Sequence, residues 1–254
     1  MPKQVQLAWG WLRHRPAWLL LTAGDEALAN QPATRFTRAW SELMLLSLLW
    51  GLASVGLWGS TWRIFDEFTG IPLIQVAAVL TAMALCVYRR AILAMAEILV
   101  GPDLPARSLA GCVIVMVLAL MLLGMRFYPY WHHGIPPLYV VLVLSPLWGG
   151  WAMLILPKFC RGGAGTEPAV KAFAEGCGPL PAAICLAMPL AATGVYFNYL
   201  PWTQLWISAA AILAAIGGGW VLCRRTGGLT RKALLADNLL TQIVFILAYL
   251  INKW

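Results

Sequence analysis

The chain has 254 residues, of which 61% are hydrophobic and only 11% charged, and its formal net charge is +8. Soluble domains carry about 25% charged residues, so this composition excludes an ordinary soluble enzyme and a soluble nucleic-acid-binding domain. We expect an all-α, polytopic membrane protein whose basic excess sets its orientation and recruits no nucleic acid.

An N-terminal arm, residues 1–39, precedes the apolar segments. It mixes the tryptophans Trp9, Trp11 and Trp18 with several cations, as in an amphipathic helix that lies in the headgroup region. An irregular arm packed on a neighbouring helix is the alternative. The apolar run 17–23 is short and follows Pro16, so we expect a mature cytosolic segment and no signal peptide.

Seven apolar segments follow, each long enough to cross most of a bilayer core at about 1.5 Å per residue. Fifteen of the 18 Lys and Arg residues fall in the arm and in alternate connections. This bias predicts a cytosolic N-terminus and an outward C-terminus. The predicted spans are 40–58, 71–87, 109–127, 137–156, 179–199, 202–223 and 233–250.

The outer connections are short and aromatic, which is typical of an interfacial belt. With the arm, they give candidate interface residues for lipid or for neighbouring membrane subunits: Trp9, Trp11, Trp18, Trp58, Trp62, Trp131 and Trp202.

The second apolar segment runs directly into Arg89 and Arg90, and ten mostly apolar residues with the single charge Glu97 follow. Arg90 and Glu97 are seven residues apart and share one stripe of a helix. We expect this helix to leave the membrane at the arginines, to stay buried against protein, and to pair Glu97 with them.

Two other acids lie at or inside predicted spans. Glu42 begins the first span four residues after Arg38, which predicts a helix-end ion pair. Asp237 lies inside the last span, where an acid is a functional candidate. The preceding Arg231 and Lys232 favour the alternative, a structural ion pair with Asp237.

The inner connection at 157–178 places Lys158 and Arg161 beside three glycines. Glycine-rich backbone next to cations can cradle a phosphate, although the spacing alone favours a flexible loop. The six cysteines are scattered without a Cys-x-x-Cys pair, and we expect the four in or at the ends of predicted spans to be small buried hydrophobic residues.

Several short motifs occur in an order known from one membrane enzyme family: IPL at 71–73, PLWGGWAM at 146–153, RGGAG at 161–165, AFAEG at 172–176 and RRTGGLT at 224–230. Together they resemble the cobalamin synthase family (adenosylcobinamide-GDP ribazoletransferase), whose members join a ribazole to GDP-activated cobinamide and release GMP. The resemblance is strongest from about 140 to 250. It implies a cobalamin-synthase-like membrane domain over 40–254, in a bacterial inner (cytoplasmic) membrane.

The resemblance also implies candidate ligand- or phosphate-binding residues on the cytosolic side: Arg89, Arg90, Lys158, Arg161, Arg224, Arg225 and Thr230. The chain departs from the family pattern at the acids expected to hold Mg²⁺. The family's three acidic positions after the second span fall on Ile92, Ala96 and Leu99. Other departures are Arg90 for a histidine, Gly150 for an arginine, Arg231-Lys232 for Gly-Asp, and Leu239 and Gln242 for acids.

Mg²⁺ takes hard oxygen ligands, so aliphatic side chains cannot hold it. We therefore expect a pseudoenzyme with no catalytic residue, no metal and no cofactor, which serves as an accessory or scaffolding subunit of a larger membrane complex. One alternative is an active transferase with Mg²⁺ and the rearranged ligands Glu97, Glu175 and Asp237. The other is a corrinoid or lipid carrier that uses the emptied site.

Overall fold

The computed structural model describes residues 10–12, 14–66, 87–99, 137–163, 166–196 and 201–252, and every regular element within these ranges is helical. The helices are α2 (Pro16–Thr22), α3 (Asp25–Ala29), η1 (Ala33–Arg38), α4 (Ala39–Asp66), an unlabelled helix at 87–99, α7 (Pro137–Phe159), α8 (Pro168–Gly176), α9 (Pro179–Tyr196), α10 (Pro201–Leu213), the π-helical turn η3 (Ala214–Gly218), α11 (Gly219–Arg225) and α12 (Arg231–Asn252). The prediction of an all-α fold is therefore confirmed for the described residues.

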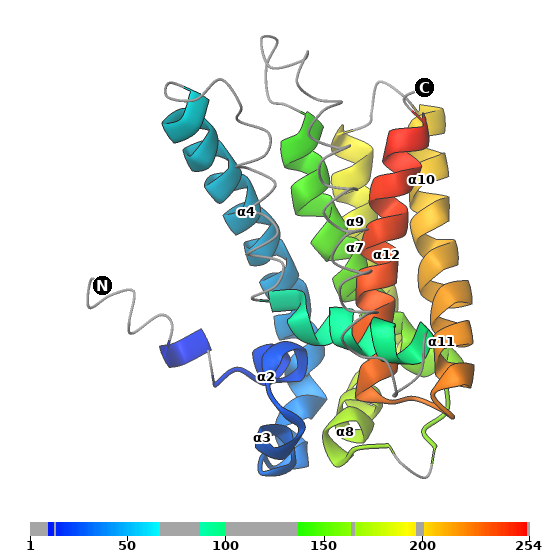
Figure 1. Ribbon diagram of the computed structural model, residues 1–254. Coiled ribbons are helices and arrows are strands. Elements are labelled where there is room, and N and C mark those ends of the chain that lie inside the picture. Colours follow the sequence, from blue (N-terminus) through cyan, green and yellow to red (C-terminus); the bar gives the residue numbers. More distant parts are fainter. Residues whose placement is uncertain are drawn as a thin grey trace.

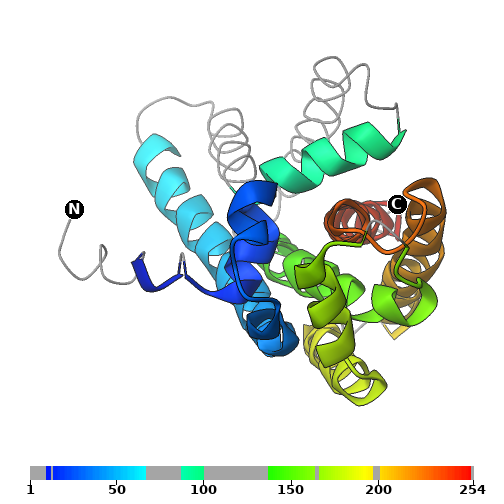
Figure 2. The same cartoon turned by 90° about the horizontal axis from the view of Figure 1, so that it is seen from below.

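The long helices stand side by side as a bundle, with α7 packed between α4 and α12 (Figure 1). The helix at 87–99 runs across this bundle rather than along it (Figure 1), and the view from below shows it extending from beside α2 toward α12 (Figure 2). The short helices α2, α3 and α8 gather at one end, and the C-terminus lies at the other (Figure 1).

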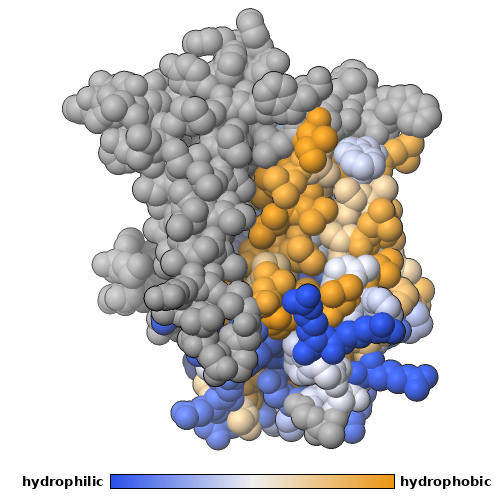
Figure 3. Space-filling view, turned by 45° about the vertical axis from the view of Figure 1, so that its right-hand side comes forward, coloured by the Kyte–Doolittle hydropathy of each residue, from blue (hydrophilic) through white to orange (hydrophobic). Residues whose placement is uncertain are grey.

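Several of these helices are long and apolar enough to cross a membrane. Four qualify alone: Ala33–Gly56, Val141–Phe159, Leu205–Arg225 and Arg231–Tyr249. A fifth is obtained if α8 and α9, which are bent by 78° at their junction, count as one span. Their outer faces carry exposed Leu, Ile and Val side chains, and Figure 3 shows apolar residues gathered above a polar lower end. These features are those of a multi-pass membrane protein.

The number of spans and their orientation stay predictions. The predicted span 109–127 lies outside the described residues, and so does 71–87 except for its last residue, where the crossing helix begins.

Tryptophans of α7 form the centre of the core. The rings of Trp148 and Trp151 meet edge to face, with centroids 5.8 Å apart, and Trp148 also stacks on Phe245 of α12. Trp148 Nε1 donates to Thr193 Oγ1 at 3.2 Å, and Trp151 Nε1 donates to the Ala182 carbonyl at 3.1 Å. Both indole N–H groups therefore have partners inside the bundle, so the PLWGGWAM motif at 146–153 has a structural role.

The N-terminal arm packs on the bundle from α2 onward. Leu20 and Phe36 are fully buried, α2 contacts α4, and η1 contacts α8. Glu42 pairs with Arg15 of the arm at 3.3 Å, so the predicted pair with Arg38 is wrong. The reason is that α2 lies against the start of α4 and brings Arg15 to the carboxylate. Trp11 is 55% exposed, and its placement at the membrane interface stays a prediction.

Candidate functional site

The helix at 87–99 occupies the place where the resemblance expects a metal-binding segment. Two of its three positions that correspond to acids, Ile92 and Ala96, are each 1% exposed, and Ile92 belongs to the hydrophobic core cluster, while Leu99 is 54% exposed. The expectation that this segment stays buried against protein is confirmed. Apart from Tyr88 and Met95 its buried side chains are aliphatic, and Ile92 and Ala96 offer no oxygen to a divalent cation.

Glu97 is the one acid on this helix, and it forms an ion pair with Lys232 at the start of α12. The predicted pairing of Glu97 with Arg89 and Arg90 is therefore wrong. The helix lies across the bundle, so its C-terminal part approaches the first turn of α12 instead of turning the carboxylate back toward the arginines.

Arg231 is 2% exposed and holds the N-terminal arm. Its guanidinium donates to the carbonyls of Leu20 at 2.8 Å, Ala23 at 2.7 Å and Leu19 at 3.3 Å, and to Asp25 Oδ1 at 2.9 Å. The Leu19 carbonyl already accepts from Ala23 N at 3.0 Å, but the last carbonyls of a helix have no donor within it, and a cation there satisfies them. Arg231 is thus a long-range cap of α2.

Asp237 forms no ion pair with Arg231 or Lys232, so that prediction is also wrong, because both cations extend toward other elements. Asp237 is 0% exposed, and neither carboxyl oxygen has a hydrogen-bond partner among the described residues. It packs against Gly219, where an added Cβ would come 2.9 Å from its Oδ1. The glycine at this position lets α11 approach the acid.

Glu167 is a second acid that sequence reasoning missed. It immediately precedes α8, and its Oε2 is buried without a hydrogen-bond partner among the described residues. Burial raises the pKa of Glu167, while the nearby Arg231 and Lys232 oppose that rise and Asp25 adds to it. Glu167 lies near Arg231 and so adds α8 to the charged contact between the arm and α12. No local pattern in the sequence indicates this long-range proximity.

The two loops that carry the glycine motifs meet each other. Leu229 N donates to the Arg161 carbonyl at 3.0 Å, and Thr166 Oγ1 donates to the Leu229 carbonyl at 2.8 Å. Gly228 has φ +137°, and a Cβ there would lie 2.7 Å from Gly163 N. Glycine is required at this crossing because a side chain would be strained and would clash. The glycines thus form a loop–loop contact.

A disulfide between Cys160 and Cys223 joins α7 to α11 beside these loops, with their Cα atoms 6.3 Å apart. The prediction of a small buried residue, made for the cysteines in or at the ends of spans, is wrong for Cys223, since its disulfide partner lies 63 residues away and no local spacing indicates the bond. It is confirmed for Cys185, which is a buried free thiol, and Cys177 is also buried and free. Burial raises the pKa of Cys177 to about 12, which makes it unreactive.

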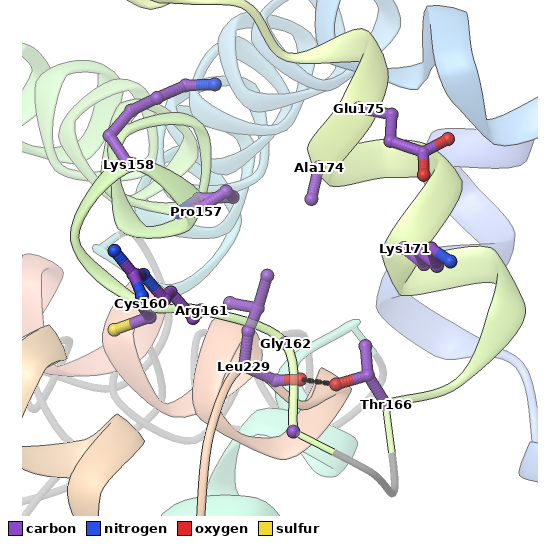
Figure 4. Close-up of a pocket in the computed structure, with 11 residues that line it drawn as sticks. Pro157, Lys158, Cys160, Arg161, Gly162, Thr166, Lys171, Ala174, Glu175 and Leu229 are labelled. Atoms are coloured by element: carbon purple, nitrogen blue, oxygen red, sulfur yellow. Dashed lines mark hydrogen bonds between the residues drawn. The ribbon is translucent and has the colours of Figure 1, made fainter.

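An open pocket of about 570 Å³ lies beside the paired loops. Figure 4 shows Lys158 of α7 across the hollow from Lys171 and Glu175 of α8, with Thr166 and Leu229 at its lower edge. Arg161 also lines it. Lys158, Arg161 and Lys171 are exposed and form no ion pair with a described residue. The pocket suits a small anion, and its single carboxylate is outnumbered by cations.

The other predicted phosphate-binding residues lie elsewhere. Thr230 accepts a hydrogen bond from Ala233 N at 3.2 Å and caps the N-terminus of α12. Arg224 lies over the Trp220 ring at 3.6 Å, and Arg225 is exposed at the end of α11. Arg89 and Arg90 line a separate cavity under α2. The structure therefore does not assemble these seven residues into one site.

The acids of the alternative transferase site are also apart. Glu97 is paired with Lys232, Glu175 of α8 lines the pocket, and Asp237 of α12 is buried against Gly219 of α11. Among the described residues, no group of three His, Cys, Asp or Glu side chains is placed to hold a metal ion.

The predicted interface tryptophans are described only in part. Trp11 is exposed with the Arg15 guanidinium 3.7 Å above its ring, and Trp18 is half-buried against the core. The remaining ones lie outside the described residues or side chains: Trp9, Trp58, Trp62, Trp131 and Trp202.

No protein-family model matches the chain, and neither the comparison with curated proteins nor that with solved structures found a match.

Proposed function

We propose that this chain is a membrane protein with a cobalamin-synthase-like scaffold that has lost the family's transferase chemistry and serves as an accessory or scaffolding subunit of a larger membrane complex. One observation carries the proposal. The positions that correspond to the family's metal-binding acids include Ile92 and Ala96, which are packed in the hydrophobic core. A divalent cation would need several oxygen ligands in the place that these side chains fill.

Two further substitutions support the same reading. Gly150 stands where the family has an arginine, and a Cβ there would collide with Ser47 Oγ of α4. Arg231 stands in place of the family's glycine and is used entirely in holding the arm. Positions that would serve a nucleotide diphosphate in the family thus serve internal packing in this chain.

The alternative transferase with rearranged ligands is disfavoured because its three carboxylates occupy three separate environments. Phosphoryl and pyrophosphate chemistry requires metal and cations around one leaving group.

Two measurements test the proposal. Purified full-length protein, given GDP-activated cobinamide, ribazole and Mg²⁺, should release GMP no faster than a protein-free control. Mild-detergent extraction from native membranes at native expression level should recover the chain with other membrane subunits. Mg²⁺-dependent GMP release would establish the transferase, and recovery of this chain alone at every expression level would contradict the accessory role.

A further inference from the structure

Two cavities lie next to each other where α2 meets the start of the helix at 87–99. The first has a volume of about 250 Å³ and is mostly apolar, with walls that include Trp18 and Leu21 of α2, Leu46 and Trp50 of α4, and Val87. Tyr88 and Asn238 also line it. An apolar cavity of roughly 150 Å³ is enough to hold benzene, so this one has room for a segment of hydrocarbon chain.

The second cavity, of about 360 Å³, is lined by Thr22, Val87, Arg89, Arg90 and Leu93. It shares Val87 with the first cavity. Trp18 and Thr22, which line one cavity each, are one turn apart on α2, and Thr22 Oγ1 donates to the Trp18 carbonyl at 2.9 Å. An apolar compartment therefore continues into a cationic one along a single face of α2.

The two arginines have no anionic partner among the described residues. The three acids that form ion pairs in the described residues are paired with other cations: Asp25 with Arg231, Glu97 with Lys232 and Glu42 with Arg15. Two adjacent guanidinium groups in a cavity favour a phosphate oxygen ligand, because each presents a planar array of N–H donors.

Two side-chain amides at the edge of the apolar cavity have partners within the bundle. Gln242 Nε2 donates to Asn238 Oδ1 at 2.5 Å, and Asn238 Nδ2 contacts Met153 Sδ at 3.3 Å. Since these amide donors already have partners, hydrocarbon in the cavity leaves neither of them unpaired.

We propose that the two cavities together bind one anionic phospholipid from the leaflet that the charge bias assigns to the cytosol. Its phosphate lies between Arg89 and Arg90, and part of one acyl chain enters the cavity between α2 and α4. The inference rests on the membrane placement within the proposed function and names the lipid chemistry that this placement would use. It does not depend on the accessory role.

Native mass spectrometry of the full-length protein in mild detergent tests the proposal. The protein is titrated with dioleoyl phosphatidylglycerol or with dioleoyl phosphatidylcholine, which share their acyl chains and differ in net charge. We expect one phosphatidylglycerol adduct, bound at least about tenfold more tightly than phosphatidylcholine. Phosphatidylcholine binding as tightly would overturn the proposal without any variant.

Paired variants locate the site. Each cation near an anionic lipid contributes about 1 kcal/mol, or roughly fivefold in binding, so Arg89→Gln with Arg90→Gln should weaken the adduct about 30-fold. Arg224→Gln with Arg225→Gln removes the same charge from another helix end and should change binding less than about threefold. Equal losses in the two variants would show unspecific surface attraction and would overturn the site.

A second pair tests the hydrocarbon compartment. Ala53 lines the apolar cavity, so Ala53→Trp should occlude the acyl chain and reduce lipid retention, whereas Leu52→Trp on the exposed face of α4 should not. Inorganic phosphate at millimolar concentration should leave the adduct in place, and its displacement of the lipid would identify a free-phosphate site instead. Because no partner subunit or nucleotide enters these assays, their failure would leave the accessory role standing.

Discussion

Arg231 joins three elements through one side chain. A buried guanidinium is stable only when its donors are satisfied, and here the carbonyls of α2 and the carboxylate of Asp25 satisfy them. The neighbouring Lys232 is more than half exposed and forms one ion pair, with Glu97. Two adjacent cations therefore contribute very differently to stability.

Replacing Arg231 should release the arm. Arg231→Met removes charge-assisted hydrogen bonds and should lower the free energy of unfolding by about 2–4 kcal/mol, and it should make the amides of 16–30 exchange faster. Hydrogen–deuterium exchange in detergent measures both effects. Lys232→Met, the matched control, should cost less than about 1 kcal/mol. Equal effects of the two variants would show that Arg231 is not the anchor.

Glu167 should make stability depend on pH. Its folded-state pKa is raised, mainly by burial, so the unfolded chain loses the proton first as pH rises. Stability should therefore fall as pH rises from the ordinary glutamate value through the folded pKa. Glu167→Gln removes this loss, and its thermal midpoint should exceed that of the wild type at pH 7 but not below pH 4.5. A constant difference across this range would contradict the assignment.

At the scale of elements, close contacts between short helices decide where the arm lies. Gly176 ends α8 directly under η1, and a Cβ there would collide with the Thr37 carbonyl. By contrast, a Cβ at Gly56 of α4 would meet no described residue within 4 Å. Gly176 therefore permits a close contact between two helices, whereas Gly56 is exposed on α4.

These glycines give a paired prediction. Gly176→Ala should displace η1 from α8 and lower the free energy of unfolding by about 2 kcal/mol, as overpacking usually does. Gly56→Ala should be neutral or stabilising by up to about 1 kcal/mol, because alanine is the better helix former. Chemical denaturation in detergent compares them. A tolerated alanine at 176 would mean that η1 does not rest on α8.

The disulfide joins α7 to α11 at the loop contact. Protein isolated with a thiol-blocking reagent and digested without reduction should yield the Cys160–Cys223 peptide pair, while Cys177 and Cys185 should be alkylated only after unfolding. In the chain-entropy account, closing a loop of 63 residues stabilises the fold by about 4 kcal/mol. Cys160→Ser should therefore lower stability to the same extent as reduction of the wild type.

At the scale of the whole molecule, polar and apolar surfaces separate along the bundle axis. The arm and α8 lie at one end and the C-terminus at the other (Figure 1), and apolar side chains cover the face between them (Figure 3). A membrane would stabilise this arrangement because it solvates the apolar face and leaves the charged residues at the end of the arm and α8 in water.

The charge bias makes the orientation testable. A fluorescent protein fused to the N-terminus should fluoresce in a bacterial host, and alkaline phosphatase fused to the C-terminus should be active, because the basic connections stay in the cytosol. Swapping the two reporters should silence both. An active phosphatase at the N-terminus would reverse the predicted topology.

The sequence by itself determined the helical class, the apolar helices and the aliphatic residues at positions 92 and 96. These properties follow from composition, hydropathy and side-chain chemistry at single positions, such as Ile92 and Ala96. The length and hydropathy of a segment are enough to predict a spanning helix, because a membrane permits few spanning structures.

Only the tertiary structure decided which charges pair and which cysteines meet. Arg231 reaches an arm more than 200 residues earlier, and Glu97 and Glu42 find partners that sequence spacing did not indicate. The physical reason is that a buried charge binds whichever donor or acceptor packing brings to it. Local spacing predicts pairs within one helix, whereas the crossing helix at 87–99 and the folded-back arm create contacts between elements.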